Sequence, residues 1–121
     1  MEINLEQELA EKLRSFYPGS RVVDSARDYI SIRSPKEDLI GVNIYRSGFV
    51  WFYLDDELLN ELRAAKFDPK LIRKDAEKRK YKIHNLNLKA VQDNELLFSK
   101  VVTRSLNIRD QRLHRTEKIY G

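Results

Sequence analysis

The chain has 121 residues, no cysteine and a formal net charge of +4, and 35% of its residues are charged. This length predicts one domain that folds without a metal ion, and the lack of cysteine excludes disulfides, thiolate metal sites and cysteine nucleophiles. No apolar run approaches the roughly 20 residues that span a bilayer. The acidic N-terminus does not resemble a signal peptide, so we expect a cytoplasmic protein without a membrane partner.

The N-terminal segment predicts an amphipathic helix over residues 2–16. Leucines recur every four residues from Leu5 to Leu13, which places them on one helix face. Asn4 is the expected N-cap, and Pro18-Gly19 is expected to end the helix.

Strands are expected next, beginning with short ones at 21–24 and 29–33. Residues 39–54 alternate in hydropathy on both sides of the turn Arg46-Ser47-Gly48, which predicts a β-hairpin. The second arm, 49–54, is apolar at every position. That pattern is typical of a central strand covered on both faces.

The period changes after residue 54. Asp55 is the expected cap of a helix that runs to Ala65, and Asp68-Pro69 predicts the start of a second short helix. A further strand is expected from Tyr81 through Leu88. Asp93 is then the expected cap of a final helix in which apolar residues recur every four positions.

This order of elements predicts an α+β fold. We expect an antiparallel sheet of four to five strands packed against N-terminal, central and C-terminal helices. The predicted domain spans residues 1–108. Residues 109–121 lack a sustained apolar period, so we expect a basic C-terminal tail whose removal leaves the domain folded.

Three segments carry a resemblance to a known domain: the hairpin 39–54, the segment 81–88 and the closing helix 94–105. In texture and order they resemble a small domain of unknown function, found alone or at the C-terminus of restriction-endonuclease-like and predicted transport proteins. That family has a glycine-containing stretch before its last strand, where this chain has the lysine-rich residues 75–80. The resemblance implies a DNA-handling or defence context and no catalytic residues.

Charge is divided unevenly along the chain. Residues 1–65 carry 8 Lys/Arg and 12 Asp/Glu, whereas residues 66–121 carry 15 and 7. Such asymmetry favours a polyanion or an acidic protein surface as partner. The leading interpretation is a small non-enzymatic module that contacts nucleic-acid phosphates. The residues predicted to do so are Lys66, Lys70, Arg73, Lys74, Lys78, Arg79, Lys80, Tyr81, Lys82, Arg109, Arg112 and Arg115.

Catalytic and metal-binding patterns are weak by comparison. His84 and His114 are 30 residues apart, and no metal-ligand spacing surrounds them, so no metal and no cofactor are expected. A restriction-type nuclease needs an acid-x-Lys on a strand, and the predicted hairpin contains no acid. Asp55-Asp56-Glu57 is explained by capping and by the helix dipole.

Two alternatives remain open at this stage. One is a protein-binding inhibitor of anti-defence type, encoded by a mobile element, which uses an acidic and aromatic surface. The other is a hydrolase with an unrecognised site. Tyr45, Trp51 and Tyr53 form either an exposed stripe or part of the core. The sequence leaves open DNA, RNA or protein as partner and the oligomeric state; the residues of the protein-binding alternative are Asp55, Asp56, Glu57, Glu61, Trp51 and Tyr53.

Overall fold

The computed structural model describes residues 5–75 and 78–120 as an α+β fold with four helices and six strands in the described part. One element differs in type from the prediction, because a strand takes the place of the short helix expected after residue 68. In chain order the elements are α1 (Leu5–Ser15), β1 (Arg21–Val23), β2 (Tyr29–Arg33), β3 (Ile40–Tyr45), β4 (Phe49–Leu54), α2 (Asp56–Ala64), β5 (Lys70–Asp75), β6 (Lys78–His84), α3 (Leu88–Asp93) and α4 (Glu95–Tyr120).

The strands form one sheet in the order β1-β2-β3-β4-β6-β5, and every neighbouring pair is antiparallel. The predicted hairpin is confirmed: β3 pairs with β4, and Tyr45 faces Phe49 next to the turn. The fully apolar segment 49–54 is β4, which lies between β3 and β6. Its central place explains why neither of its faces is polar.

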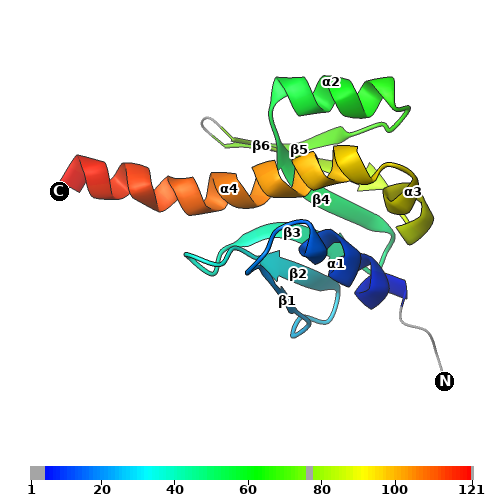
Figure 1. The fold of residues 1–121 in the computed structure, drawn as a ribbon, viewed down its shortest axis with the longest axis horizontal. Helices are drawn as coiled ribbons and strands as arrows, with labels where there is room; N and C mark the ends of the chain where they lie inside the picture. The colour runs from blue at the N-terminus through cyan, green and yellow to red at the C-terminus, as the bar shows by residue number, and fades with distance from the viewer. Residues whose placement is uncertain (1–4, 76–77, 121) are drawn as a thin grey trace.

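Helices α1 and α4 lie across one side of the sheet, with α3 beside them (Figure 1). The core forms between them and one face of the strands, where alternate residues such as Ile30, Val42 and Phe52 are fully buried. From the helices, Leu13 and Phe98 complete this layer. The described helices include none with the length and apolar character that a membrane crossing requires.

A hydroxyl group from α4 joins β3 to β4 where the two strands separate. The register between them ends at Val42 and Phe52. At the next position Ser105 Oγ accepts a hydrogen bond from the Tyr53 amide at 2.8 Å and donates one to the Gly41 carbonyl. Glycine at position 41 leaves room for α4, because a Cβ there would lie 2.6 Å from Leu106 Cδ2 and 3.2 Å from Leu106 Cα.

The helix predicted to begin at Asp68-Pro69 is wrong, because residues 70–75 and 78–84 are paired strands. β6 pairs with β4 from Phe49 opposite His84 to Leu54 opposite Arg79, which satisfies the second hydrogen-bonding edge of β4. The alternation of Tyr81 and Ile83 with polar neighbours is a strand signal. A register shift between Leu71 and Arg73 breaks the same signal in β5.

The ends of the later elements also differ from prediction. β6 stops at His84 because Asn85 has a φ of 58°, and Asn87 then caps α3 by accepting from the Ala90 amide. Asp93 ends α3, so it does not cap the last helix; the Asn94 carbonyl accepts from Phe98 instead. The Asp55 cap is confirmed, since its carboxylate accepts from the Leu58 amide at 2.9 Å. The predicted cap Asn4 lies outside the described residues.

α4 continues as a helix past the predicted domain boundary at residue 108 (Figure 1). Asp110 is 4% exposed, and its carboxylate accepts from the Tyr17 hydroxyl at 3.2 Å. Packing against the rest of the molecule therefore extends at least to Asp110.

Candidate nucleic-acid interface

The sheet has a second face, which points away from α1 and α4 and is called the back face here. Strand alternation and register assign residues to it, because directly opposed residues share a face. Trp51 is opposite Lys82, and Lys82 is opposite Lys70. Tyr53 is opposite Lys80, which is opposite Arg73. Further members of the back face on β2, β3, β4 and β6 are Tyr29, Ser31, Asn43, Tyr45, Phe49 and His84, and by register position also Arg33 of β2 and Lys78 of β6.

Lysines from β6 lie over the aromatic rings of β4. Lys80 Nζ is 4.1 Å from the centre of the Trp51 ring and 5.6 Å from that of Tyr53, and Lys82 Nζ is 5.2 Å from that of Phe49. These are cation–π distances. The aliphatic stems of such lysines cover apolar surface while their ammonium groups stay in water. Trp51 and Tyr53 are consequently only 6% and 7% exposed.

The Trp51 ring is also held by polar side chains of the neighbouring strands β3 and β2. Asn43 lies between Ser31 and Trp51, and all three are buried. With the amide oriented to satisfy both neighbours, Asn43 Nδ2 donates to Ser31 Oγ at 2.7 Å and Oδ1 accepts from Trp51 Nε1 at 3.3 Å. This hydrogen-bonded row fixes the indole under the lysines.

Arg109 of α4 places a guanidinium group at the end of the sheet where Tyr53 and Lys80 lie. Its Cζ lies 5.2 Å from the centre of the Tyr53 ring. Its Nε is buried and has no hydrogen-bond partner among the described residues. The guanidinium charge is therefore held beside the ring of Tyr53.

The structure divides the predicted basic segment between the two faces. Lys70, Arg73, Lys80 and Lys82 belong to the back face. Arg79 belongs to the helix side, where it pairs with Asp56 at 3.0 Å. A hydrogen bond with Tyr81, followed by the charge of Asp56, raises the pKa of Arg79.

Tyr81 requires a correction. It was predicted to stack on bases, but it is 5% exposed and part of the hydrophobic core, so its ring is not accessible to a ligand. Lys66 is exposed at the end of α2, with a φ of 69°. Four further predicted residues are placed by backbone alone: Lys74 opposite Arg79, Lys78 opposite Asp75, and Arg112 and Arg115 within α4.

A row of four aromatic rings crosses the back face next to the lysines. Tyr29 and Tyr45 lie 5.2 Å apart between ring centres, Tyr45 and Phe49 stack at 4.4 Å, and Phe49 and His84 lie 5.7 Å apart. Sequence reasoning missed this row, because its members come from four different strands. The alternation within each strand was visible, but the strand order that aligns them was not.

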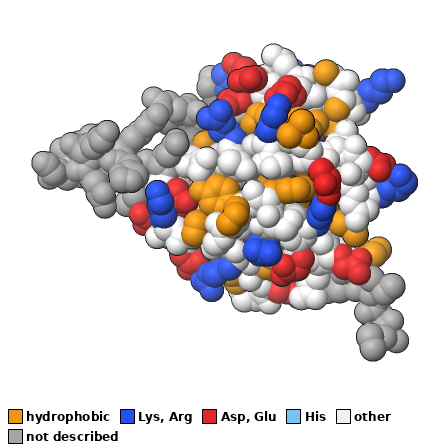
Figure 2. Space-filling view, in the orientation of Figure 1, with side chains coloured by type: hydrophobic (Ala, Val, Ile, Leu, Met, Phe, Trp, Pro, Cys, Tyr) orange, Lys and Arg blue, Asp and Glu red, His pale blue; other side chains and the backbone are white. Residues whose placement is uncertain are grey.

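The acidic residues of the protein-binding alternative lie on the helix side, and three of the four are already paired with cations. Asp55 bonds Arg104 at 3.1 Å, Asp56 bonds Arg79, and Glu61 bonds Lys100 at 3.2 Å. Figure 2 shows acidic and basic side chains intermixed on this side. Trp51 and Tyr53 belong to the back face, so the structure does not bring the two predicted halves of that surface together.

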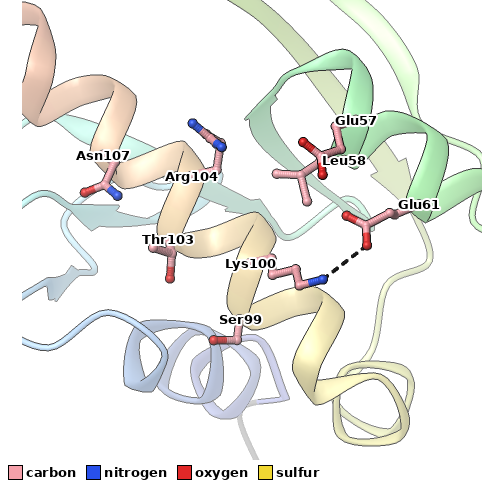
Figure 3. Close-up of a pocket in the computed structure, with 8 residues that line it drawn as sticks. All are labelled: Glu57, Leu58, Glu61, Ser99, Lys100, Thr103, Arg104 and Asn107. Atoms are coloured by element: carbon pink, nitrogen blue, oxygen red, sulfur yellow. Dashed lines mark hydrogen bonds and ion pairs between the residues drawn. The ribbon is translucent and has the colours of Figure 1, made fainter.

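The two ion pairs made by Lys100 and Arg104 lie at a groove of about 390 Å³ between α2 and α4 (Figure 3). Lys100 reaches from α4 to Glu61 of α2 across it, and Arg104 reaches the acidic end of α2. The charges in the groove therefore hold the two helices together. The lining residues are Glu57, Leu58, Glu61, Ser99, Lys100, Thr103, Arg104 and Asn107.

Within residues 5–75 and 78–120, no three His, Cys, Asp or Glu side chains lie close enough to hold a metal ion. Comparison of the chain with protein-family models, curated proteins and solved structures gives no significant match.

Proposed function

We propose that this protein is a small non-enzymatic module that binds nucleic acid by its phosphates, through the back face of β5 and β6 and Arg109. The observation that carries the proposal is that two pairs of positively charged residues stand directly opposite each other on β5 and β6. Lys70 is directly opposite Lys82, and Arg73 is directly opposite Lys80. The next register pair on the same face of these strands is Asp75 opposite Lys78.

Like charges directly opposite each other destabilise a sheet, by roughly 0.2–1 kcal/mol per pair. The pair of Lys70 and Lys82 therefore favours an anion that neutralises both lysines. A polyanion fits better than a single small anion, because the positive charge extends along two strands and then to Arg109 on α4. Nucleic-acid phosphates have this spaced arrangement of charge.

Lysine ammonium groups that contact phosphates carry no direct sequence information. The proposal therefore predicts binding that varies little with base sequence and weakens steeply with salt. On the helix side Asp55, Asp56 and Glu61 are paired with the nearby cations, so the attraction for the same ligand is weaker there.

The test measures fluorescence anisotropy of labelled oligonucleotides with the wild type, with Lys80→Ala/Lys82→Ala, and with Lys89→Ala/Lys100→Ala. The last variant removes the same charge from α3 and α4. At about 50 mM salt we expect the back-face variant to bind at least about tenfold more weakly, because two charge-assisted contacts are lost. The helix variant should bind within about twofold of wild type, since its lysines are paired with Asp93 and Glu61 of the helices.

Equal affinity of the back-face variant and wild type would overturn the proposal. No binding by wild type at about 50 mM salt would also overturn it, because electrostatic contacts are strongest at low salt. The second result would favour a protein partner instead.

A further inference from the structure

The aromatic row defined by Tyr29, Tyr45, Phe49 and His84 is partly exposed, although it forms an apolar band on a sheet face. It belongs to four adjacent strands, β2, β3, β4 and β6. With strands about 4.8 Å apart, it spans roughly 14 Å. Such a length accommodates several flat apolar groups side by side.

The row lies directly beside the cations of the back face. Phe49 is opposite His84, and the next pair on the same face of these strands is Trp51 opposite Lys82. Residues two positions apart along a strand, which share a face, are about 6.8 Å apart. Lys82 Nζ reaches back to 5.2 Å from the Phe49 ring, so an ammonium group and an accessible ring are neighbours.

This juxtaposition selects among nucleic acids. A double helix presents phosphates, but its bases are stacked and paired inside. A single strand presents phosphates and unstacked bases together, and base–aromatic stacking then adds to the electrostatic attraction. We propose that the ligand of the back face is single-stranded nucleic acid, with bases on the aromatic row and phosphates on Lys70 and Lys82; this inference rests on the proposed function.

The two lysine-covered rings are not part of this base-binding row. Trp51 and Tyr53 are buried under Lys80, and Trp51 is hydrogen-bonded to Asn43. Their rings pack beneath the side chain of Lys80. Trp51 is the one tryptophan of the chain. Its fluorescence therefore reports whether a ligand contacts the lysines above it.

The experiment compares three probes: an oligodeoxythymidylate of about 20 nucleotides, the same strand paired with oligodeoxyadenylate, and heparin, which is polyanionic without bases. The variants are Phe49→Leu, Tyr45→Leu and His84→Ala. Leucine keeps apolar volume at the two half-buried positions, and His84 is exposed, so thermal melting should show each variant folded. Phe67→Leu is the control, because Phe67 packs against Phe98 on the helix side.

We expect the wild type to prefer the single strand to the duplex. Each ring removed from the row should weaken single-strand binding by roughly 5- to 150-fold while heparin binding changes less than about twofold. Phe67→Leu should leave all three affinities near wild type.

Equal wild-type affinity for single strand and duplex would overturn the inference, as would ring variants that bind oligodeoxythymidylate like wild type. The proposed function fails differently. If Lys80→Ala/Lys82→Ala leaves oligonucleotide and heparin binding unchanged, the back face is not the site and both proposals fail. If that variant loses both ligands while the ring variants lose neither, the phosphate-binding proposal stands and the single-strand inference falls.

Discussion

The hydroxyl of Ser105 accepts a hydrogen bond from the backbone amide of Tyr53 at 2.8 Å, at the point where β4 has separated from β3. The same hydroxyl donates to the carbonyl of Gly41, so it replaces a missing link between the strands. Residues four apart lie on one face of a helix. This contact therefore also places Arg109, one turn later on α4, over the Tyr53 ring.

Replacing Ser105 with alanine should destabilise the fold. Both backbone groups that Ser105 satisfies would lose their partner in a buried place, and each unsatisfied group costs about 1–3 kcal/mol. Urea unfolding followed by circular dichroism measures the change. Ser99→Ala on the same helix is the control, because Ser99 is partly exposed. A Ser105→Ala variant as stable as Ser99→Ala would show that the hydroxyl does not join the strands.

Shortening the chain should have little effect until Asp110 is removed. A chain that ends after Arg112 keeps the contact between Asp110 and Tyr17, whereas one that ends after Ile108 loses it together with the contact between Arg109 and Tyr53. Losing about 1 kcal/mol should lower the melting temperature of the shorter chain by roughly 3–6 °C. Calorimetry of both chains measures this. Equal melting temperatures would mean that Arg109 and Asp110 contribute no stability.

The Tyr17 hydroxyl should contribute to the free energy of unfolding when the pH is below its pKa, and it should contribute less when the pH is above it. The Tyr17 hydroxyl contacts Asn107 Oδ1 at 2.6 Å and Asp110 Oδ2 at 3.2 Å. Burial first, and then the charge and hydrogen bond of Asp110, raise the pKa of Tyr17 above its usual value of 10.0. The folded state thus favours the protonated phenol. Its contribution is complete below the unfolded pKa and is lost as pH rises through the folded pKa.

We therefore expect Tyr17→Phe to be less stable than wild type by about 1 kcal/mol at about pH 8. The difference should shrink toward about pH 11, because the unfolded chain, whose phenol has the lower pKa, then releases the proton more readily than the folded chain. Urea unfolding at both pH values measures it. A difference that stays constant or grows with pH would contradict this role of Tyr17.

Local signals in the sequence were sufficient for part of the fold. The hairpin of β3 and β4 follows from alternation around a turn at Gly48, whose φ is 113°, and the cap at Asp55 follows from one residue and its helix. β5 was missed because its register shift after Leu71 removes the strand period. Its pairing with β6 was also not visible locally.

The candidate site needed information that the sequence did not supply. Alternate residues of β6 lie on opposite faces of the sheet, so Lys80 and Lys82 are separated from Arg79 and Tyr81. This alternation could not be used while the segment was predicted to begin with a helix. Charge identified the segment correctly as the basic part of the chain. Which cations share a face depended on the register with β4 and β5, and the aromatic row depended on the strand order.

The central claim is that the back-face cations neutralise phosphates, and the salt dependence of oligodeoxythymidylate binding tests it most directly. Titrations followed by Trp51 fluorescence give the affinity at several salt concentrations. If Lys70, Arg73, Lys80, Lys82 and Arg109 each neutralise one phosphate of a single strand, the log–log slope should be about −3.5. That slope means a loss of roughly 130-fold between about 50 and 200 mM salt.

The variant Lys70→Ala/Lys80→Ala/Lys82→Ala should bind more weakly, and its slope should be flatter by about 2, because three phosphate contacts are lost. The same titration, followed by anisotropy, removes any effect of the variant on Trp51 emission. Lys89→Ala/Lys100→Ala should keep the wild-type slope. A triple variant with the wild-type slope would contradict the claim, because the phosphates would then be neutralised elsewhere on the molecule.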